Sequence, residues 1–218
     1  ISTTSTNLGP VYLWRNVYDR VRMWYSDPWG NERDRVAAFK SDDFSNAETG
    51  ERRYIYHNTL LQPPYDSENA PGPNSLGTGQ SAGGASNFAM INTVSRNNIY
   101  DLWKTGWDVF ATTDSSDDLD YDTSNANLTE AHGESGAAQY QSGNGWVGTY
   151  PGRNNYHGKY RLKPGTPGHD DGAVIPNFDD GYHGAAPDRG AAEDGLPDLT
   201  FGVTASGISC SSCSPTYS

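Results

Sequence analysis

The sequence predicts an α+β protein in which an N-terminal amphipathic helix packs on a mainly antiparallel β-sheet, with long Gly-, Asp- and Asn-rich loops between the strands. Apolar residues recur at three- and four-residue steps between positions 11 and 25, which is the spacing of one helix face. Short segments of alternating character follow, and these are typical of half-buried strands. Gly (25) and Pro (13) are frequent among the 218 residues, so much of the chain should be turns and loops. At this length we expect one domain, 1–218.

The N-terminal helix is expected within residues 1–30. Pro10 suits a first helical turn, and Asp27-Pro28 would end the helix. A helix with an aromatic residue in nearly every turn needs a broad partner such as a sheet. The expected apolar face comprises Val11, Trp14, Val17, Tyr18, Val21, Trp24 and Tyr25.

Residues 31–110 are expected to contain mixed strands and a long polar loop. The loop spans 62–87 and is nearly free of apolar residues. A loop of this length is uncommon unless it binds something or packs on a neighbour. Ile99, Trp103, Trp107 and Phe110 suggest a second short helix. No repeat of fixed period is visible, so the pattern does not indicate a solenoid. The expected strands are 36–39, 52–57 and 88–94.

Residues 111–218 are expected to form an acidic, loop-rich C-terminal part. Five Asp residues lie between positions 114 and 122, and Asn- and Gly-rich sequence continues to Asn144. The segments 145–150 and 156–162 resemble the two strands of a final hairpin.

Charge excludes some classes of partner. The chain has 15 Lys+Arg and 27 Asp+Glu, a net charge of −12 and a pI near 4.6, so phosphate backbones would be repelled. No apolar run approaches the roughly 20 residues that span a bilayer. Few Lys residues, many Asn, Gly, Tyr and Thr, and one sequon at Asn127-Leu128-Thr129 favour an extracellular or cell-surface location.

The two cysteines, Cys210 and Cys213, are spaced as Cys-Ser-Ser-Cys near the C-terminus. A redox motif would need a following helix, and a closed zinc site would need further ligands. We therefore expect a small disulfide loop that holds the tail.

The C-terminal Asp/Gly segments are the strongest candidate for a metal site. Crowded carboxylates repel one another unless they stay in solvent or a cation gathers them. Calcium suits the second case, because it takes 6–8 oxygen ligands and glycines let backbone carbonyls contribute. The run Asp194-Gly195-Leu196-Pro197-Asp198 resembles the acidic loops of thrombospondin type 3-like calcium repeats. The predicted ligands are Asp170, Asp171, Asp179, Asp180, Asp194 and Asp198.

Other kinds of metal or catalytic site have weaker support in the sequence. His169 and His183 lie within the acidic region, so a transition-metal site of His and Asp can be drawn. Glu130 and Glu134 flank His132 and offer paired carboxylates for glycoside hydrolysis, with Trp and Tyr as sugar platforms. No nucleophile elbow or phosphate loop is present, so the sequence leans against an enzyme and assigns no catalytic residue.

The leading functional hypothesis is an extracellular structural protein, such as a subunit of a filament, pilus-like appendage or other surface assembly, stabilised by calcium. Its expected partners are copies of itself or other extracellular subunits. The segment Asp27-Pro28-Trp29-Gly30-Asn31 resembles a short motif of type II secretion pseudopilins, and a helix followed by a sheet and a late disulfide is similar to type IV pilins. The apolar first half of a pilin helix is absent, and the cysteines are closer than in a pilin loop. The alternatives are a secreted polysaccharide hydrolase with a carboxylate or metal site, and a non-catalytic carbohydrate-binding module.

Overall fold

The structure is a computed structural model, which describes a subset of the chain. The described residues are 10–18, 52–61, 92–101, 109–110, 113, 115–141 and 160–197, and the backbone of a few further strand residues is also placed. Within them there is no helix, and the two main sheets contain only parallel strands. The predicted N-terminal helix on an antiparallel sheet is therefore wrong.

The strands form two main sheets and two small pairs. The first sheet has the order β11-β9-β7-β2 and contains β2 (Val11–Trp14), β7 (Arg53–Tyr56), β9 (Thr93–Arg96) and β11 (Asp118–Leu119). The second has the order β13-β12-β10-β8-β3 and contains β3 (Val17–Asp19), β8 (Thr59–Leu61), β10 (Ile99–Asp101), β12 (Thr123–Ser124) and β13 (Glu134–Ser135). Apart from these sheets, β1 (Ser2–Thr3) pairs in parallel with β6 (Lys40–Ser41), and β4 (Trp24–Ser26) pairs antiparallel with β5 (Glu32–Asp34).

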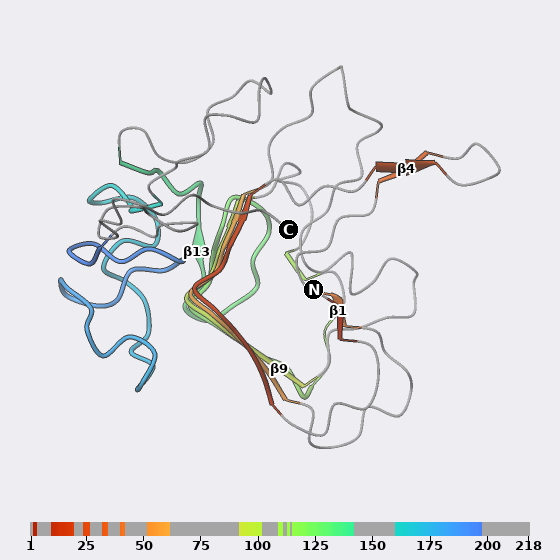
Figure 1. Ribbon diagram of the computed structural model, residues 1–218, viewed down its shortest axis with the longest axis horizontal. Helices are drawn as coiled ribbons and strands as arrows, with labels where there is room; N and C mark the ends of the chain where they lie inside the picture. The colour runs from red at the N-terminus through yellow and green to blue at the C-terminus, as the bar shows by residue number, and fades with distance from the viewer. Residues whose placement is uncertain are drawn as a thin grey trace, which may run out of the picture.

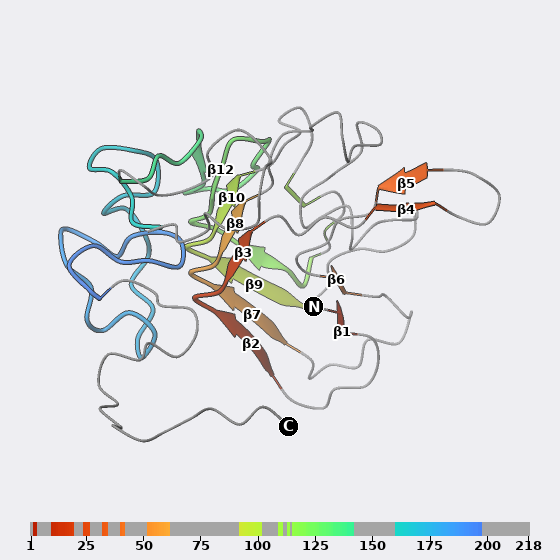
Figure 2. The same ribbon diagram turned by 45° about the horizontal axis from the view of Figure 1, so that its top comes forward.

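The two main sheets are built from stacked coils, which makes this part of the chain a parallel β-solenoid. In each coil a strand of the first sheet leads through a corner of two residues, or three between β11 and β12, into a strand of the second sheet. Figure 1 shows the coils superposed along the line of sight with an angular cross-section, and Figure 2 shows their strands side by side. The expectation that no solenoid is present is thus also wrong. Equivalent corner residues lie 42, 40 and 24 positions apart, because loops of different length separate the coils.

In the segment predicted as the N-terminal helix, the spacing of apolar residues arises from two strands and a corner. In β2, Tyr12 and Trp14 are exposed while Val11 and Leu13 are partly buried, which is the period of two that a strand requires. Arg15 has a φ of 51°, in the left-handed region, and turns the chain into β3. Two short strands joined by a corner therefore produce apolar spacings of three and four without a helix.

The remaining predicted elements have mixed outcomes. Strand 52–57 is confirmed as β7, and strand 88–94 is confirmed only where it overlaps β9. The predicted second helix is wrong at its start, since Ile99 lies in β10. Phe110 of that predicted helix is described and packs against the buried core. The remaining predicted elements, which are the middle of that helix, strand 36–39, loop 62–87 and most of the final hairpin, lie outside the described residues, although Tyr140 and Leu162 form an antiparallel bridge.

The interior of the coils combines an apolar cluster with a column of amides. Ile55, Leu60, Tyr100, Val109 and Ala126 form the buried cluster, and side chains such as Leu13, Tyr18 and Phe110 pack against it. Burying such side chains contributes about 1.5–3 kcal/mol each, which is the main favourable term in so small a cross-section.

The second residue of each corner points into the coil and forms an Asn ladder, which we define as Asn16, Asn58, Asn98 and Asp122. Nδ2 of Asn16 donates to Oδ1 of Asn58 at 3.0 Å, and Nδ2 of Asn58 donates to Oδ1 of Asn98 at 2.9 Å. Nδ2 of Asn98 then donates to Oδ1 of Asp122 at 2.9 Å. Each amide can both donate and accept, so a stack of them satisfies buried polar atoms from coil to coil.

Residues 160–197, which we call the C-terminal segment, cover the outer side of the corners and of the second sheet. Figure 1 shows this segment, in cyan to blue, beside the corner of the stacked coils. Leu61, Tyr160 and Ala192 form one buried cluster across this contact. The backbone N–H of Ala191 also donates to Oγ1 of Thr59 at 2.9 Å.

Among the described residues, no helix is long and apolar enough to cross a membrane.

Candidate functional site

The first residue of each corner faces outward toward the C-terminal segment. These residues are Arg15, His57, Asn97 and Tyr121, and all four have left-handed φ values between 51° and 60°. The corner geometry requires this backbone conformation, and it aims four chemically different side chains at one surface. The C-terminal segment closes over them and forms the candidate site.

The buried His57 ties the corner to the C-terminal segment. It is fully buried, its Nδ1 lies 3.1 Å from the carbonyl oxygen of Asp188, and its Nε2 lies 3.0 Å from Nδ2 of Asn97 and 3.3 Å from Oδ2 of Asp179. Burial lowers the pKa of His57, against the opposing effect of Asp179. In the neutral ring, Nδ1–H donates to Asp188 and Nε2 accepts from Asn97. His57 therefore has a structural role at this corner.

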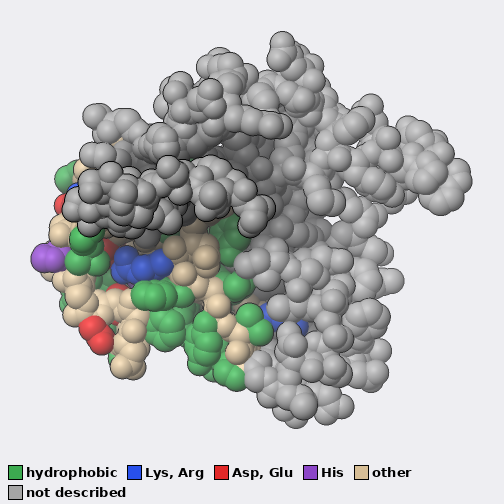
Figure 3. All heavy atoms as spheres, viewed as in Figure 1, with side chains coloured by type: hydrophobic (Ala, Val, Ile, Leu, Met, Phe, Trp, Pro, Cys, Tyr) green, Lys and Arg blue, Asp and Glu red, His purple; other side chains and the backbone are tan. Residues whose placement is uncertain are grey.

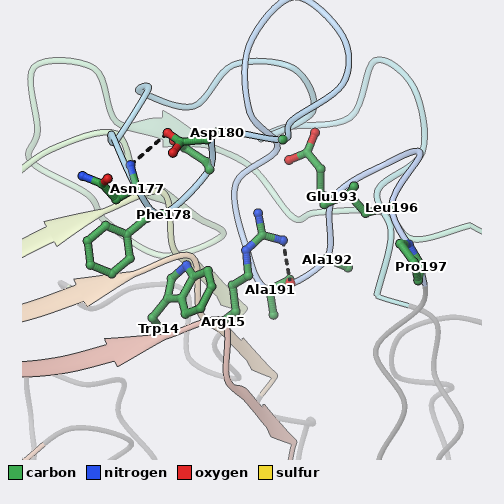
Figure 4. Close-up of a pocket in the computed structure, with 12 residues that line it drawn as sticks. Trp14, Arg15, Asn177, Phe178, Asp180, Ala191, Ala192, Glu193, Leu196 and Pro197 are labelled. Atoms are coloured by element: carbon green, nitrogen blue, oxygen red, sulfur yellow. Dashed lines mark hydrogen bonds between the residues drawn. The ribbon is translucent and has the colours of Figure 1, made fainter.

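A cavity of about 350 Å³ opens at the first corner, between β2 and the C-terminal segment. Figure 4 shows Arg15 entering it between Phe178 and Trp14 on one side and Glu193 on the other. Its lining residues are Trp14, Arg15, Asn177, Phe178, Asp179, Asp180, Gly181, Ala191, Ala192, Glu193, Leu196 and Pro197.

Arg15 supplies the positive charge of this cavity. Its Nη1 donates to the carbonyl oxygen of Ala191 at 3.5 Å, and its guanidinium lies 5.8 Å from the centre of the Trp14 ring. Burial lowers the pKa of Arg15, while Glu193 and Asp179 raise it. A guanidinium remains charged under these conditions, so it offers N–H donors in a partly dry cavity.

The cavity carboxylates are used to hold the loops. Glu193 is 2% exposed, and it accepts from the N–H groups of His183 at 3.1 Å and Asp188 at 2.9 Å. Burial raises the pKa of Glu193 to about 7, against these donors, which lower it. Both oxygens of Asp179 accept from the N–H of Ile175, and Asp180 accepts from the N–H of Asn177. This arrangement assigns the three carboxylates to loop stabilisation and does not display an acid–base pair.

The outer face of the first sheet adjoins the cavity and carries an aromatic patch, defined here as Tyr12, Trp14, Tyr54, Tyr56 and Phe178. Tyr12 and Tyr54 stack with their ring centres 4.8 Å apart, because they are register partners in β2 and β7. Phe178 from the C-terminal segment lies 5.7 Å from both the Tyr12 and Trp14 rings and 5.1 Å from the Tyr56 ring. Tyr12 and Trp14 remain 52% and 44% exposed. Figure 3 shows hydrophobic side chains gathered over this sheet.

The predicted calcium ligands are distributed around the C-terminal segment. Asp171 pairs with Arg189, whereas Asp179 and Asp180 line the cavity. Asp170 lies in a cluster with His169 and Asp188, and no other predicted ligand belongs to a metal-ligating cluster among the described residues. The carboxylate of Asp194 lies 3.5 Å from the side-chain amide of Gln141. Asp198 lies outside the described residues, so the calcium site as a whole stays a prediction.

Glu130 and Glu134, the other carboxylate candidates, face different neighbours. Glu130 accepts from the N–H of Asp122 at 2.9 Å, and burial together with the Asp122 charge raises the pKa of Glu130 to about 9. Glu134 accepts from the N–H of Gly168, and burial raises its pKa. His132 pairs instead with Asp120 at 2.7 Å, while Cys210 and Cys213 lie outside the described residues.

Sequence reasoning missed Arg15, the aromatic patch and the Asn ladder. The available signal was a short recurring pattern in which an Asn or Asp lies between a turn residue and a small or β-branched residue. It reads Arg15-Asn16-Val17, His57-Asn58-Thr59, Asn97-Asn98-Ile99 and Tyr121-Asp122-Thr123.

Comparisons with protein-family models, curated proteins and solved structures find no match.

Proposed function

We propose that the aromatic patch and the adjoining cavity bind a carbohydrate chain without cleaving it, in an extracellular setting. The observation that carries the proposal is the exposure of the Tyr12 and Trp14 rings, 52% and 44%, on one sheet face beside a cavity that contains Arg15. Exposed aromatic rings next to a few fixed polar groups are typical of ligand sites.

The chemistry of the face fits a sugar polymer. Ring faces pack against the C–H groups of a pyranose, while the Arg15 guanidinium and loop amides are able to bond to hydroxyl groups. The rigid sheet presents the rings in fixed positions, so little conformational entropy is lost on binding. A net charge of −12 disfavours strongly anionic polymers, which makes neutral polysaccharides the expected class.

Binding without turnover is favoured over hydrolysis by the state of the cavity carboxylates. Glycoside hydrolysis needs one carboxyl group free to protonate the leaving group and another facing the sugar or a water molecule. Asp179, Asp180 and Glu193 instead accept hydrogen bonds from backbone N–H groups. The filament hypothesis used a short motif, a late disulfide and an N-terminal helix that the described residues do not contain, and it stays a prediction alongside this proposal.

Affinity electrophoresis against a panel of neutral and anionic polysaccharides tests the proposal. We expect at least one neutral polymer to retard the wild-type protein, and Trp14→Ala with Tyr12→Ala to weaken binding about tenfold or more, equivalent to roughly 1.4 kcal/mol. Val174→Ala is the matched control, because Val174 is 55% exposed and lies outside the cavity and patch.

Two results would contradict the proposal. One is that no polymer in the panel retards the wild-type protein, and the other is that the double variant binds as tightly as the Val174 control. Release of reducing ends by the wild type, abolished in Glu193→Gln, would replace binding by hydrolysis as the function.

A further inference from the structure

His169, Asp170 and Asp188 form a cluster outside the cavity lining. One ligand atom from each residue lies within 4.8 Å of the others. We propose that these three side chains bind a divalent first-row transition-metal ion, for which Zn²⁺ is the appropriate probe, and that this ion fastens the C-terminal segment. The inference does not depend on the carbohydrate proposal.

Asp188 is the best-oriented candidate ligand. It is 1% exposed, its Oδ1 accepts from the N–H of Asp170 at 2.9 Å, and its Oδ2 accepts from the N–H of Asp194 at 2.9 Å. Each carboxylate oxygen has a second lone pair, so both backbone bonds are compatible with metal binding. Hydrogen bonds of this kind fix the orientation of metal-binding carboxylates in proteins.

His169 provides an independent observation. Its side chain is 12% exposed, its Nδ1 lies 3.5 Å from Oδ2 of Asp170, and its Nε2 is buried without a hydrogen-bond partner among the described residues. The contact of Nδ1 with Asp170 leaves Nε2 buried and unsatisfied, which is costly. A bond from Nε2 to a metal ion would give this buried nitrogen a partner.

The ligand types select the class of ion. One imidazole and two carboxylates suit Zn²⁺ and the neighbouring transition metals, whereas Ca²⁺ takes 6–8 oxygens and no nitrogen. Zinc binds nitrogen and carboxylate oxygen at about 2.0–2.2 Å, so its ligand atoms lie about 3–4 Å apart. The ligand atoms of His169, Asp170 and Asp188 lie within 4.8 Å of one another, so they would approach one another slightly to share one ion.

The cluster joins two limbs of the C-terminal segment that are 18 positions apart. One limb contains Asp170, and the other contains Asp188, whose carbonyl oxygen contacts His57. An ion bound here would hold the loop against the corner and contribute its binding free energy to the folded state.

The test uses chelator-treated, desalted full-length protein titrated with Zn²⁺ alone, followed by calorimetry and by the melting temperature. We expect one high-affinity equivalent per chain and a rise in melting temperature with free Zn²⁺. His169→Gln and Asp170→Asn should each weaken zinc binding about tenfold or more. His183→Gln is the matched control, because His183 is an exposed histidine of the same segment outside the cluster, and it should bind as the wild type does.

Co²⁺ titration of the wild-type protein keeps the proposal testable if the variants fold poorly, since the visible spectrum of bound Co²⁺ reports its ligands. A folded wild-type protein that binds neither Zn²⁺ nor Co²⁺ overturns the proposal. So does zinc binding that His169→Gln and Asp170→Asn leave unchanged, binding that disappears in His183→Gln, or binding of Ca²⁺ in preference to Zn²⁺.

Discussion

Replacing Asn58 by Ala should cost about 3–5 kcal/mol of unfolding free energy. The Asn58 side chain is fully buried, and its Oδ1 accepts from both the backbone N–H and Nδ2 of Asn16. Its Nδ2 carries two N–H donors, which share three acceptors within 3.0 Å. These acceptors are the carbonyl oxygens of Leu13 and Tyr56 and Oδ1 of Asn98. Two donated and two accepted bonds at about 1 kcal/mol each give about 4 kcal/mol.

Urea unfolding followed by far-ultraviolet circular dichroism measures this loss, with Gln139→Ala as the control because Gln139 is exposed. The control should change stability by less than about 0.5 kcal/mol. Asn58→Asp gives a sharper comparison, because it keeps the acceptors but loses both donors. Its carboxylate would lie against Oδ1 of Asn98, so the folded-state pKa would be raised and the variant should lose stability as pH rises above about 4. An Asn58→Ala protein as stable as the Gln139 control would refute the idea that the Asn ladder stabilises the coils.

Three glycine variants separate backbone strain from steric clash. Gly190→Ala should cost about 2–5 kcal/mol in urea unfolding, because φ is +90° and the new Cβ would lie 2.6 Å from Cδ1 of Ile99. Gly165→Ala should cost about 1 kcal/mol, since φ is +76° but the space around the new Cβ is open. Gly181→Ala should be close to neutral. Equal costs for the Gly190 and Gly165 variants would contradict the packing of the C-terminal segment on the coils. Unfolding free energy should also fall as pH rises from about 4.5 to 9. Burial first, and then the nearby charge of Asp122, raise the pKa of Glu130 from 4.5 to about 9, so in this range the folded state holds a proton that the unfolded state releases. Glu130→Gln should flatten that dependence, and an unchanged slope in denaturant titrations would show that Glu130 is ionised in the folded protein.

The sequence supports individual strands better than it supports their arrangement. The sequence alternation in 52–57 predicted β7, although in the structure Arg53, Ile55 and Tyr56 are all buried and only Tyr54 is partly buried. In 11–18 the same physics produced a false helix, since the corner at Arg15 and Asn16 shifts the phase between two strands. A parallel pairing also leaves no local sign in the sequence, because partners lie 42 or 40 positions apart.

The candidate site was harder to predict for the same reason. Tyr12 and Phe178 meet only because the C-terminal segment returns to the first corner, and no spacing rule relates residues so distant. Aspartate-rich segments suggested a cation by composition, yet the structure pairs Asp171 with Arg189 and uses Asp179 to fix a loop. The identity of a carboxylate's partner is a tertiary property that local sequence does not contain.

The two columns of corner residues explain how one architecture carries both stability and specificity. The inner column repeats one chemistry, since Asn58 must accept from the coil before it and donate to the coil after it. The outer column carries four different side chains. Each meets a different part of the C-terminal segment, although His57 and Asn97 also bond to each other. Arg15 therefore enters the cavity while His57 ties the segment down by its backbone contact with Asp188. Changes at Arg15 should alter binding with little effect on coil stacking, whereas changes in the Asn ladder should unfold the coils first.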